Sequence, residues 1–164
     1  MKEIKNFLEE KDFLELENLM CKSWFPWYKN NSVVKKGDGH TQFTHTFYLN
    51  SLVKSDFFST LNPLINKLKP EFLIKIKANL LLKNDKIIEH GMHVDMHNSK
   101  FCKYATTSIL YLNTNNGHTV IKTGNKKIKS ERNKLVTFKA SEEHTGTTCT
   151  DEEYRIILNL NYLK

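Results

Sequence analysis

The spacing of apolar residues changes at Phe72 from a helical pattern to a strand pattern, and this change limits the folds that the chain can adopt. Before that point two stretches space their apolar residues as helices do, residues 5–19 and residues 55–68, with Ser55 as the expected N-cap and Pro70 as the stop. After it, short runs rich in Ile, Leu, Val and Thr are separated by turn residues, which is typical of strands. The expected strands are 73–82, 106–112, 119–123, 134–138 and 155–162, with an extended segment at 43–48 and turns at 84–85 and 113–117.

This order of elements predicts the α+β class, with an antiparallel jelly-roll core backed by N-terminal helices. A length of 164 residues suits a single domain, which we divide into helical support over 1–70 and a jelly-roll core over 71–164. No apolar run approaches the roughly 20 residues of a membrane span, and the polar start is unlike a secretory signal. We therefore expect a cytoplasmic protein with no membrane partner. The sequence does not predict an oligomeric state.

The formal net charge of +7 raises the hypothesis of a nucleic-acid partner. Only Arg132 and Arg155 are Arg among the 25 basic residues, although Arg is the usual residue for reading guanine edges. Lys, Asn and Ile are also abundant along the whole chain, as an AT-rich genome would produce. The charge is therefore weak evidence for a polyanion.

Several residue types that often carry chemistry have structural interpretations here. The three cysteines are far apart and form no C-x-x-C, so we expect packing residues rather than disulfides or zinc ligands. Four histidines are expected at the surface or in turns. The aromatic run 24–28 is expected to pack the first helix onto the barrel, and the alternative is that it walls a substrate channel. These residues are Cys21, Cys102 and Cys149, then His40, His45, His90 and His118.

The segment 91–95 (GMHVD) holds the pattern most suggestive of chemistry. On an extended chain the side chains of His93 and Asp95 leave the same face. With His144 they form the set of two His and one carboxylate that holds non-haem Fe(II) and leaves positions open. A His-x-Asp pair alone is a frequent chance match. The alternative set of His93, Asp95 and His97 resembles a zinc-hydrolase site, but it leaves His144 and Arg155 unexplained.

Arg155 stands at the start of the apolar run 156–160, where a charge is costly unless it is paired. An inward-facing Arg there needs an anion, and a dicarboxylate fits its planar fork of donors. The alternative is a surface charge at a strand edge.

The order His93-x-Asp95, His144 and Arg155 resembles the Fe(II)/2-oxoglutarate-dependent dioxygenases, closest to their prolyl-4-hydroxylase-like branch. The segment 76–80 (IKANL) precedes the motif at the family's spacing. The segment 107–113 (TSILYLN) resembles the family's T-x-x-x-Y-L-N strand, and 117–119 (GHT) matches its G-x-T. The resemblance covers residues 72–162. The amino-acid sequences of segments 113–117 and 144–147 are similar to those of small family members encoded by marine phages, which makes a viral source an expectation.

The resemblance implies a double-stranded β-helix in which His93, Asp95 and His144 are the catalytic iron ligands. It implies that Arg155 and Tyr111 bind the distal carboxylate of 2-oxoglutarate, and that Asn79 and Thr107 line the same pocket. Two features depart from the pattern. Position 155 is Arg where collagen-type enzymes have Lys, and residues 80–82 are all Leu where many relatives have a Tyr.

The implied reaction consumes Fe(II)-bound 2-oxoglutarate and O2 and hydroxylates an unactivated C–H bond. The expected substrate is a prolyl or other residue in a peptide or protein. Two alternatives stay open, namely oxidation of nucleic-acid bases and a jelly-roll module that binds metal without catalysis.

Overall fold

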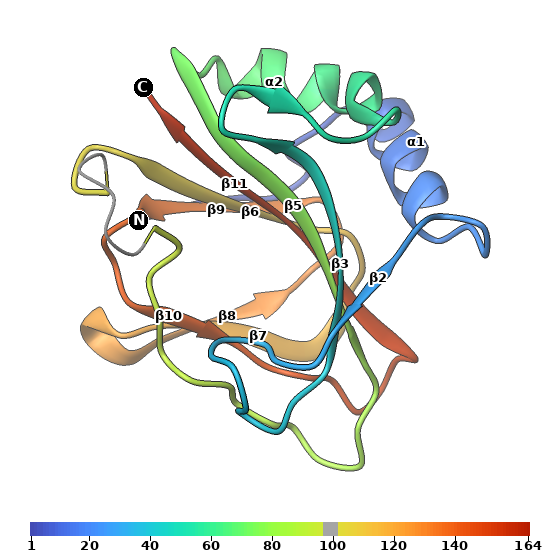
Figure 1. Ribbon diagram of the computed structural model, residues 1–164, viewed down its shortest axis with the longest axis vertical. Helices are drawn as coiled ribbons and strands as arrows, with labels where there is room; N and C mark the ends of the chain where they lie inside the picture. The colour runs from blue at the N-terminus through green and yellow to red at the C-terminus, as the bar shows by residue number, and fades with distance from the viewer. Residues whose placement is uncertain (97–101) are drawn as a thin grey trace.

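The computed structural model describes residues 1–96 and 102–164, and these residues form mostly β structure with few helices (Figure 1). A large sheet of eight strands has the order β1-β9-β6-β11-β5-β3-β2, with β4 paired to β3, and a small sheet has the order β10-β7-β8. The strands of the large sheet are β1 (Lys2–Ile4), β2 (Tyr28–Asn30), β3 (Gln42–Leu49), β4 (Leu52–Val53), β5 (Phe72–Leu82), β6 (Thr106–Tyr111), β9 (Lys134–Lys139) and β11 (Tyr154–Leu163). The small sheet contains β7 (Asn115–Ile121), β8 (Lys126–Ser130) and β10 (His144–Gly146).

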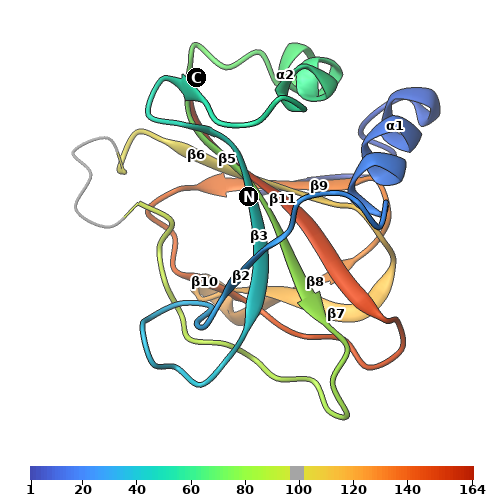
Figure 2. The same cartoon turned by 45° about the vertical axis from the view of Figure 1, so that its right-hand side comes forward.

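The elements stack in three layers, which Figures 1 and 2 show from two sides. Helices α1 (Glu10–Met20) and α2 (Asn62–Leu68) cover one face of the large sheet, and the small sheet faces its other side. The main apolar core lies between helices and large sheet, and includes Phe13, Leu16, Leu64, Ile76, Ala78, Leu158 and Leu160. A smaller core includes Ile109, Tyr111, Ile121, Ile128, Val136 and Phe138. The molecule therefore has separate apolar clusters on the two faces of its large sheet.

The antiparallel pair β5 and β11 runs through the middle of the large sheet and sets the register of its inner face, the face that looks toward the small sheet. Along this pair Arg155 lies opposite Leu81, Ile157 opposite Asn79, Asn159 opposite Lys77, and Asn161 opposite Lys75. Because side chains alternate along a strand, these eight residues share the inner face, and the residues between them face the helices.

The first expected helix, 5–19, begins later than its apolar pattern suggests. Residues 2–4 instead pair with β9, and the backbone N–H groups of Phe7 and Leu8 are bonded by Asn133. Helix α1 then starts at Glu10, and Arg132 donates to both Glu10 and Glu17, which attaches the helix to the turn before β9. Long-range pairing of residues 2–8 therefore replaces the first turn of the expected helix.

The second expected helix, 55–68, forms in two pieces. The Ser55 hydroxyl accepts a bond from the N–H of Phe57 in a turn, a short 3-10 helix η1 (Phe58–Leu61) follows, and α2 begins at Asn62. Pro63 lies in the first turn of α2, where its missing N–H leaves no helical bond broken. The prediction that the helix ends before Pro70 is confirmed, with Lys69 in the left-handed conformation.

All five strands predicted after Phe72 are present, with ends shifted by up to four residues, and the segment 43–48 lies within β3. The turn expected at 113–117 is wrong in part, because β7 already starts at Asn115 and reaches His118 through an irregular register. Strands β1, β2, β4, β8 and β10 were not expected. Each has at most five residues, and β8 (KKIKS) has only one apolar residue, so their formation depends on neighbouring strands. None of the described helices has the length and apolarity required to cross a membrane.

Candidate metal centre and its cavity

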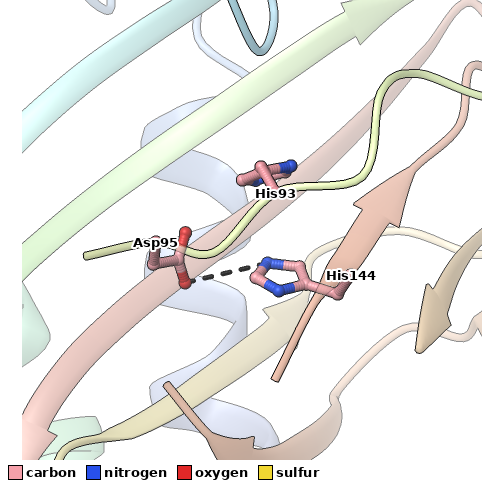
Figure 3. A group of neighbouring side chains, drawn as sticks. All are labelled: His93, Asp95 and His144. Carbon is pink, nitrogen blue, oxygen red and sulfur yellow. Dashed lines mark ion pairs between the residues drawn. The ribbon is translucent and has the colours of Figure 1, made fainter. Parts of the chain in front are cut away.

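His93, Asp95 and His144 come together between the two sheets. The extended segment that carries His93 pairs with β10, because the backbone N–H of His93 and that of His144 each donate to the other's carbonyl at 3.0 and 2.9 Å. One ligand-type atom from each of the three side chains lies within 4.8 Å of the other two. Figure 3 shows the three side chains turned toward one another, with His144 Nε2 at 3.8 Å from Asp95 Oδ2. The folded chain thus forms one group of three candidate ligands.

The two imidazoles are oriented by backbone carbonyls. Nδ1 of His93 lies 3.2 Å from the carbonyl oxygen of Gly91, and Nδ1 of His144 lies 3.0 Å from that of Glu142. Since a carbonyl oxygen only accepts, each Nδ1 carries a proton, and Nε2 is the ring nitrogen that is left to face a metal. Burial, helped by His144, lowers the pKa of His93, which favours the neutral imidazole that a metal requires.

The carboxylate of Asp95 is held by three donors from the inner face of the large sheet. The amides of Asn159 and Asn161 and the hydroxyl of Thr107 donate to Asp95 Oδ2 at 3.1, 3.0 and 3.1 Å. Burial by itself would raise the pKa of Asp95. His144, the Lys75 ammonium and the two amides outweigh this effect and hold the pKa well below its usual range. Asp95 is therefore an ionised carboxylate held in a fixed orientation, as a candidate ligand.

A cavity of about 80 Å³ connects this group with Arg155. Its lining comes from strands of both sheets, from the segment that carries His93 and Asp95, and from Val33 in the loop before β3. The described residues that line it are Val33, Gln42, Lys77, Asn79, Leu81, His93, Asp95, Ile109, Thr119, His144, Thr145, Gly146, Arg155, Ile157 and Asn159.

Arg155 is almost completely buried, with 2% of its surface exposed, and it forms no ion pair with any described carboxylate. The segment 97–101 (HNSKF), outside the described residues, contains no Asp or Glu that would supply one. The Nε of Arg155 donates to Ser130 Oγ at 2.7 Å, and its Nη2 donates to Thr119 Oγ1 at 3.1 Å. Burial lowers the pKa of Arg155. A buried guanidinium without an anion is a costly arrangement unless a ligand brings one.

Gly117 and Thr119 both contact Arg155 and shape its surroundings. A side chain at Gly117 would place its Cβ 2.7 Å from Arg155 Cδ and 2.8 Å from the Thr148 carbonyl oxygen, so only glycine fits. Thr119 Oγ1 accepts from Arg155 and from the Tyr111 hydroxyl at 2.8 Å. With two donors on its oxygen, the Thr119 hydroxyl has its own proton left to donate, and Thr119 lines the cavity.

No protein-family model matches the sequence, and no curated protein matches it. Solved structures do match. A 2OG-Fe(II) oxygenase family oxidoreductase from Burkholderia pseudomallei has a TM-score of 0.73 and 15% identity, covering 97% of this chain and 82% of that chain. A prolyl hydroxylase from Trichoplax adhaerens, in complex with a hypoxia inducible factor peptide fragment, has a TM-score of 0.71 and 15% identity over 99% and 82%. The viral collagen prolyl hydroxylase of Paramecium Bursaria Chlorella virus-1, as its 2OG complex, has a TM-score of 0.64 and 14% identity over 99% and 96%. This chain has the 2OG-Fe(II) oxygenase fold.

Of the other residues that the sequence analysis expects at the site, some line the cavity and others lie behind it. Asn79 lines the cavity, and its expected contact with 2-oxoglutarate stays a prediction. Thr107 does not line the cavity and instead supports Asp95. The Tyr111 hydroxyl lies behind Thr119 rather than in the cavity lining. His97, the third member of the alternative zinc set, lies outside the described residues.

The surface prediction is wrong for two of the four other histidines. His45 is buried in β3, where its ring nitrogens contact the Pro26 carbonyl and Ser55 Oγ at 2.8 and 2.7 Å. His90 is also buried, beside the ring of His40. A half-polar imidazole fits an interior wherever carbonyls, hydroxyls or other rings surround it, and sequence spacing does not reveal such partners.

The burial of the cysteines and the contacts of the aromatic run 24–28 test the packing roles expected for them. All three cysteines are free, and the packing prediction holds for buried Cys149 but is wrong for exposed Cys21. In the aromatic run Phe25 packs on Phe47, and Trp27 Nε1 donates to the Met20 carbonyl at the end of α1. No aromatic residue of the run lines the described cavity, which favours the packing interpretation.

Four residues of the cavity region were not singled out from the sequence. Thr119, Lys77, Asn159 and Asn161 all project toward the interior between the sheets. For Lys77, Asn159 and Asn161 the available signal was the alternation of polar and apolar residues in IKIKAN and in RIILNLN, where Ile157 interrupts it. Period-two polarity usually marks a solvent face, and here it marks the cavity.

Proposed function

We propose that this protein is an Fe(II)- and 2-oxoglutarate-dependent dioxygenase built on a double-stranded β-helix core. Residues 71–164 would supply that core and residues 1–70 its support, as one domain. The main support is that one cavity is lined both by the group of two His and one carboxylate and by the buried guanidinium of Arg155, which has no anion in the described structure. The shared fold of solved 2OG-Fe(II) oxygenases supports the proposal.

The donor set fits iron. Two imidazoles whose Nδ1 atoms are bonded to carbonyls and one ionised carboxylate match the ligand types of the non-haem Fe(II) facial triad, which leaves positions for other molecules. His93, Asp95 and His144 would hold the ion. Asn159, Asn161 and Thr107 would keep the carboxylate in place, because partners of this kind orient metal ligands and raise metal affinity.

The far end of the cavity fits one carboxylate of 2-oxoglutarate. Arg155 would bind it through its guanidinium and Thr119 through its spare hydroxyl proton, while Tyr111 acts through Thr119. Asn79 would line the co-substrate's path, and Leu81, Ile109 and Ile157 would exclude water around it. When bound, Fe(II), 2-oxoglutarate and O2 supply the chemistry that hydroxylates an unactivated C–H bond with release of succinate and CO2.

The substrate we propose is a prolyl or other residue of a peptide. A structural neighbour was solved with a peptide, and two neighbours are prolyl hydroxylases by name. The chain's own residues would bind and orient the target, and the walls of the cavity would keep water away from the reacting position.

Turnover of 2-oxoglutarate separates this proposal from a module that only binds metal. With Fe(II) and O2 present, we expect the native protein to form succinate, and a His93→Ala variant to form at least about a hundredfold less. His40→Ala is the matched control, because His40 lies outside the cavity, and it should keep native turnover. A native protein that binds metal but forms no succinate would be a binding module.

A further inference from the structure

Strand β5 carries two lysines near the candidate site, Lys75 and Lys77, and the proposed reaction uses neither of them. Lys77 lines the cavity, and Lys75 lines the pocket beyond Asp95 that also includes Asn161. In the register of β5 and β11, Lys77 lies opposite Asn159 and Lys75 opposite Asn161, the two amides that hold Asp95. Leu81, the partner of Arg155, is four residues from Lys77, or about 13 Å along a strand. Lys77 therefore lies at the end of the cavity near Asp95, away from Arg155, and Lys75 lies in the adjoining pocket on the far side of Asp95.

Neither lysine forms an ion pair with a carboxylate side chain in the described chain. The segment 97–101 cannot provide one, because it contains no Asp or Glu. Lys75 Nζ lies 3.4 Å from the backbone carbonyl oxygen of Asp95. Burial, with the neighbouring charge of Lys75, lowers the pKa of Lys77. A partly buried ammonium without a counter-ion destabilises the protein unless a ligand compensates it.

The charges of a loaded site leave the same excess. Asp95 is the only acid that lines either pocket in the described residues. A divalent metal ion and the two carboxylates of 2-oxoglutarate cancel, and so do Asp95 and Arg155. Lys75 and Lys77 then remain as uncompensated positive charges beside Asp95.

We propose that Lys77, assisted by Lys75, binds a carboxylate of the substrate and so selects acidic substrates. The reaction on that substrate rests on the proposed function, whereas the binding preference does not. A carboxylate is favoured over a nucleic-acid phosphate because no Phe, Tyr or Trp lines the described cavity to stack a base. The carboxylate belongs either to an acidic residue of a peptide or to a free amino acid.

The probes are sub-libraries of blocked octapeptides whose central residue is Asp, Glu, Asn or Gln and whose other positions exclude acids. The free amino acids L-aspartate, L-glutamate, L-asparagine and L-glutamine and a single-stranded oligothymidylate complete the set. Calorimetric titration measures each dissociation constant with Mn(II) and 2-oxoglutarate present and again without them. A Lys77→Met variant removes the charge, Lys77→Arg retains it, and Lys127→Met, on the exposed part of β8, is the control for net charge.

We expect acidic peptides or free acidic amino acids to bind at least about tenfold more tightly than their amide counterparts, as one charge-assisted contact provides. Lys77→Met should remove this difference, Lys77→Arg should retain most of it, and Lys127→Met should not change it. Peptide binding would identify the acidic-peptide source, and binding of the free amino acids alone would identify the small-molecule source.

Equal binding of acidic and amide probes, or a preference that survives Lys77→Met, would overturn the inference. So would tighter Lys77-dependent binding of the oligothymidylate, which would assign the lysines to phosphate. A loss of more than about tenfold in 2-oxoglutarate affinity in Lys77→Met would assign Lys77 to the co-substrate instead. Failure of the native protein to bind 2-oxoglutarate refutes the proposed function alone, since the metal-free titrations still test the preference for acids.

Discussion

The two faces of the strand pair β5 and β11 differ sharply in the side chains that they carry. The face under the helices carries Ile76, Ala78, Leu80, Leu158 and Leu160, all buried in the main core. The inner face of the same strands carries lysines, asparagines and Arg155, and it borders the cavity. One backbone therefore supports an apolar core on one side and a polar interior on the other.

This difference separates the residues that stabilise the fold from those that serve the site. Burial of the apolar face contributes roughly 25 cal/mol per Å² of surface removed from water. The polar face contributes little of this kind, because charged and amide groups lose hydration and regain only part of it. Asn159 Oδ1 and Asn161 Oδ1 are buried without a hydrogen-bond partner in the described structure. The inner face is thus arranged for ligands at some expense of stability.

The largest expected effect falls on the outer face. Leu158 is fully buried under the helices, so Leu158→Ala should lower the free energy of unfolding by about 3 to 4 kcal/mol through lost burial and a residual cavity. Urea denaturation measures the change. The folded variant should still bind 2-oxoglutarate within about twofold of native, and a tenfold loss would show that the two faces are not independent.

The inner face should respond in the opposite way. Arg155→Met should weaken 2-oxoglutarate binding about thirtyfold or more, because the charged donors are lost, while destabilising the protein less than Leu158→Ala does. Titration calorimetry and urea denaturation report the two quantities. Arg132→Met, at the other Arg of the chain, should leave the dissociation constant within about twofold. If both variants bind equally well, Arg155 has no role in binding the co-substrate.

His90 extends the comparison to a buried polar group outside the strands. Burial and the neighbouring His40 lower the pKa of His90 to about 4, against 6.5 as its ordinary value, and neither ring nitrogen has a described hydrogen-bond partner. The folded state therefore binds a proton more weakly than the unfolded state. The contribution of neutral His90 is fully present above about pH 6.5 and is lost as the pH falls toward 4.

We expect this one group to remove about 2 kcal/mol of stability between about pH 7.5 and pH 5. Urea denaturation at both values, compared with a His90→Phe variant, isolates the contribution from that of Asp38 and the other nearby groups. The variant should lose correspondingly less stability over this range. An identical pH dependence in both proteins would show that His90 is not the responsible group.

The smallest expected effect concerns the amides that hold Asp95. Asn161→Ala should weaken binding of Fe(II) or Mn(II) about tenfold, as loss of a partner to a metal ligand does. Ser108→Ala is the control, because Ser108 Oγ is buried and bonded to Tyr162 and Thr137. Both variants lose buried hydrogen bonds, but only the first should change metal affinity. Equal affinities would mean that Asp95 needs no support from Asn161.

Sequence periodicity predicted the long strands well because each of them buries a continuous apolar face, as Leu158 and Leu160 do in β11. It failed where tertiary pairing overrides local preference, as in residues 2–4, which join β9, and in the Lys-rich strand β8. The ligand group was predictable because the motif and its resemblance name residue types. The supporting roles of Thr119 and Asn161 depend on which strand lies opposite which, and one sequence does not specify that register.

If His93, Asp95 and His144 hold one Fe(II) ion within reach of a diacid bound at Arg155, chelation of 2-oxoglutarate should produce a metal-to-ligand absorption band. Anaerobic titration with Fe(II) and then 2-oxoglutarate measures this band. We expect a saturable band in the native protein and none in Asp95→Ala. Absence of the band in the native protein, or its full retention in Asp95→Ala, would show that these residues do not hold the ion that chelates the co-substrate.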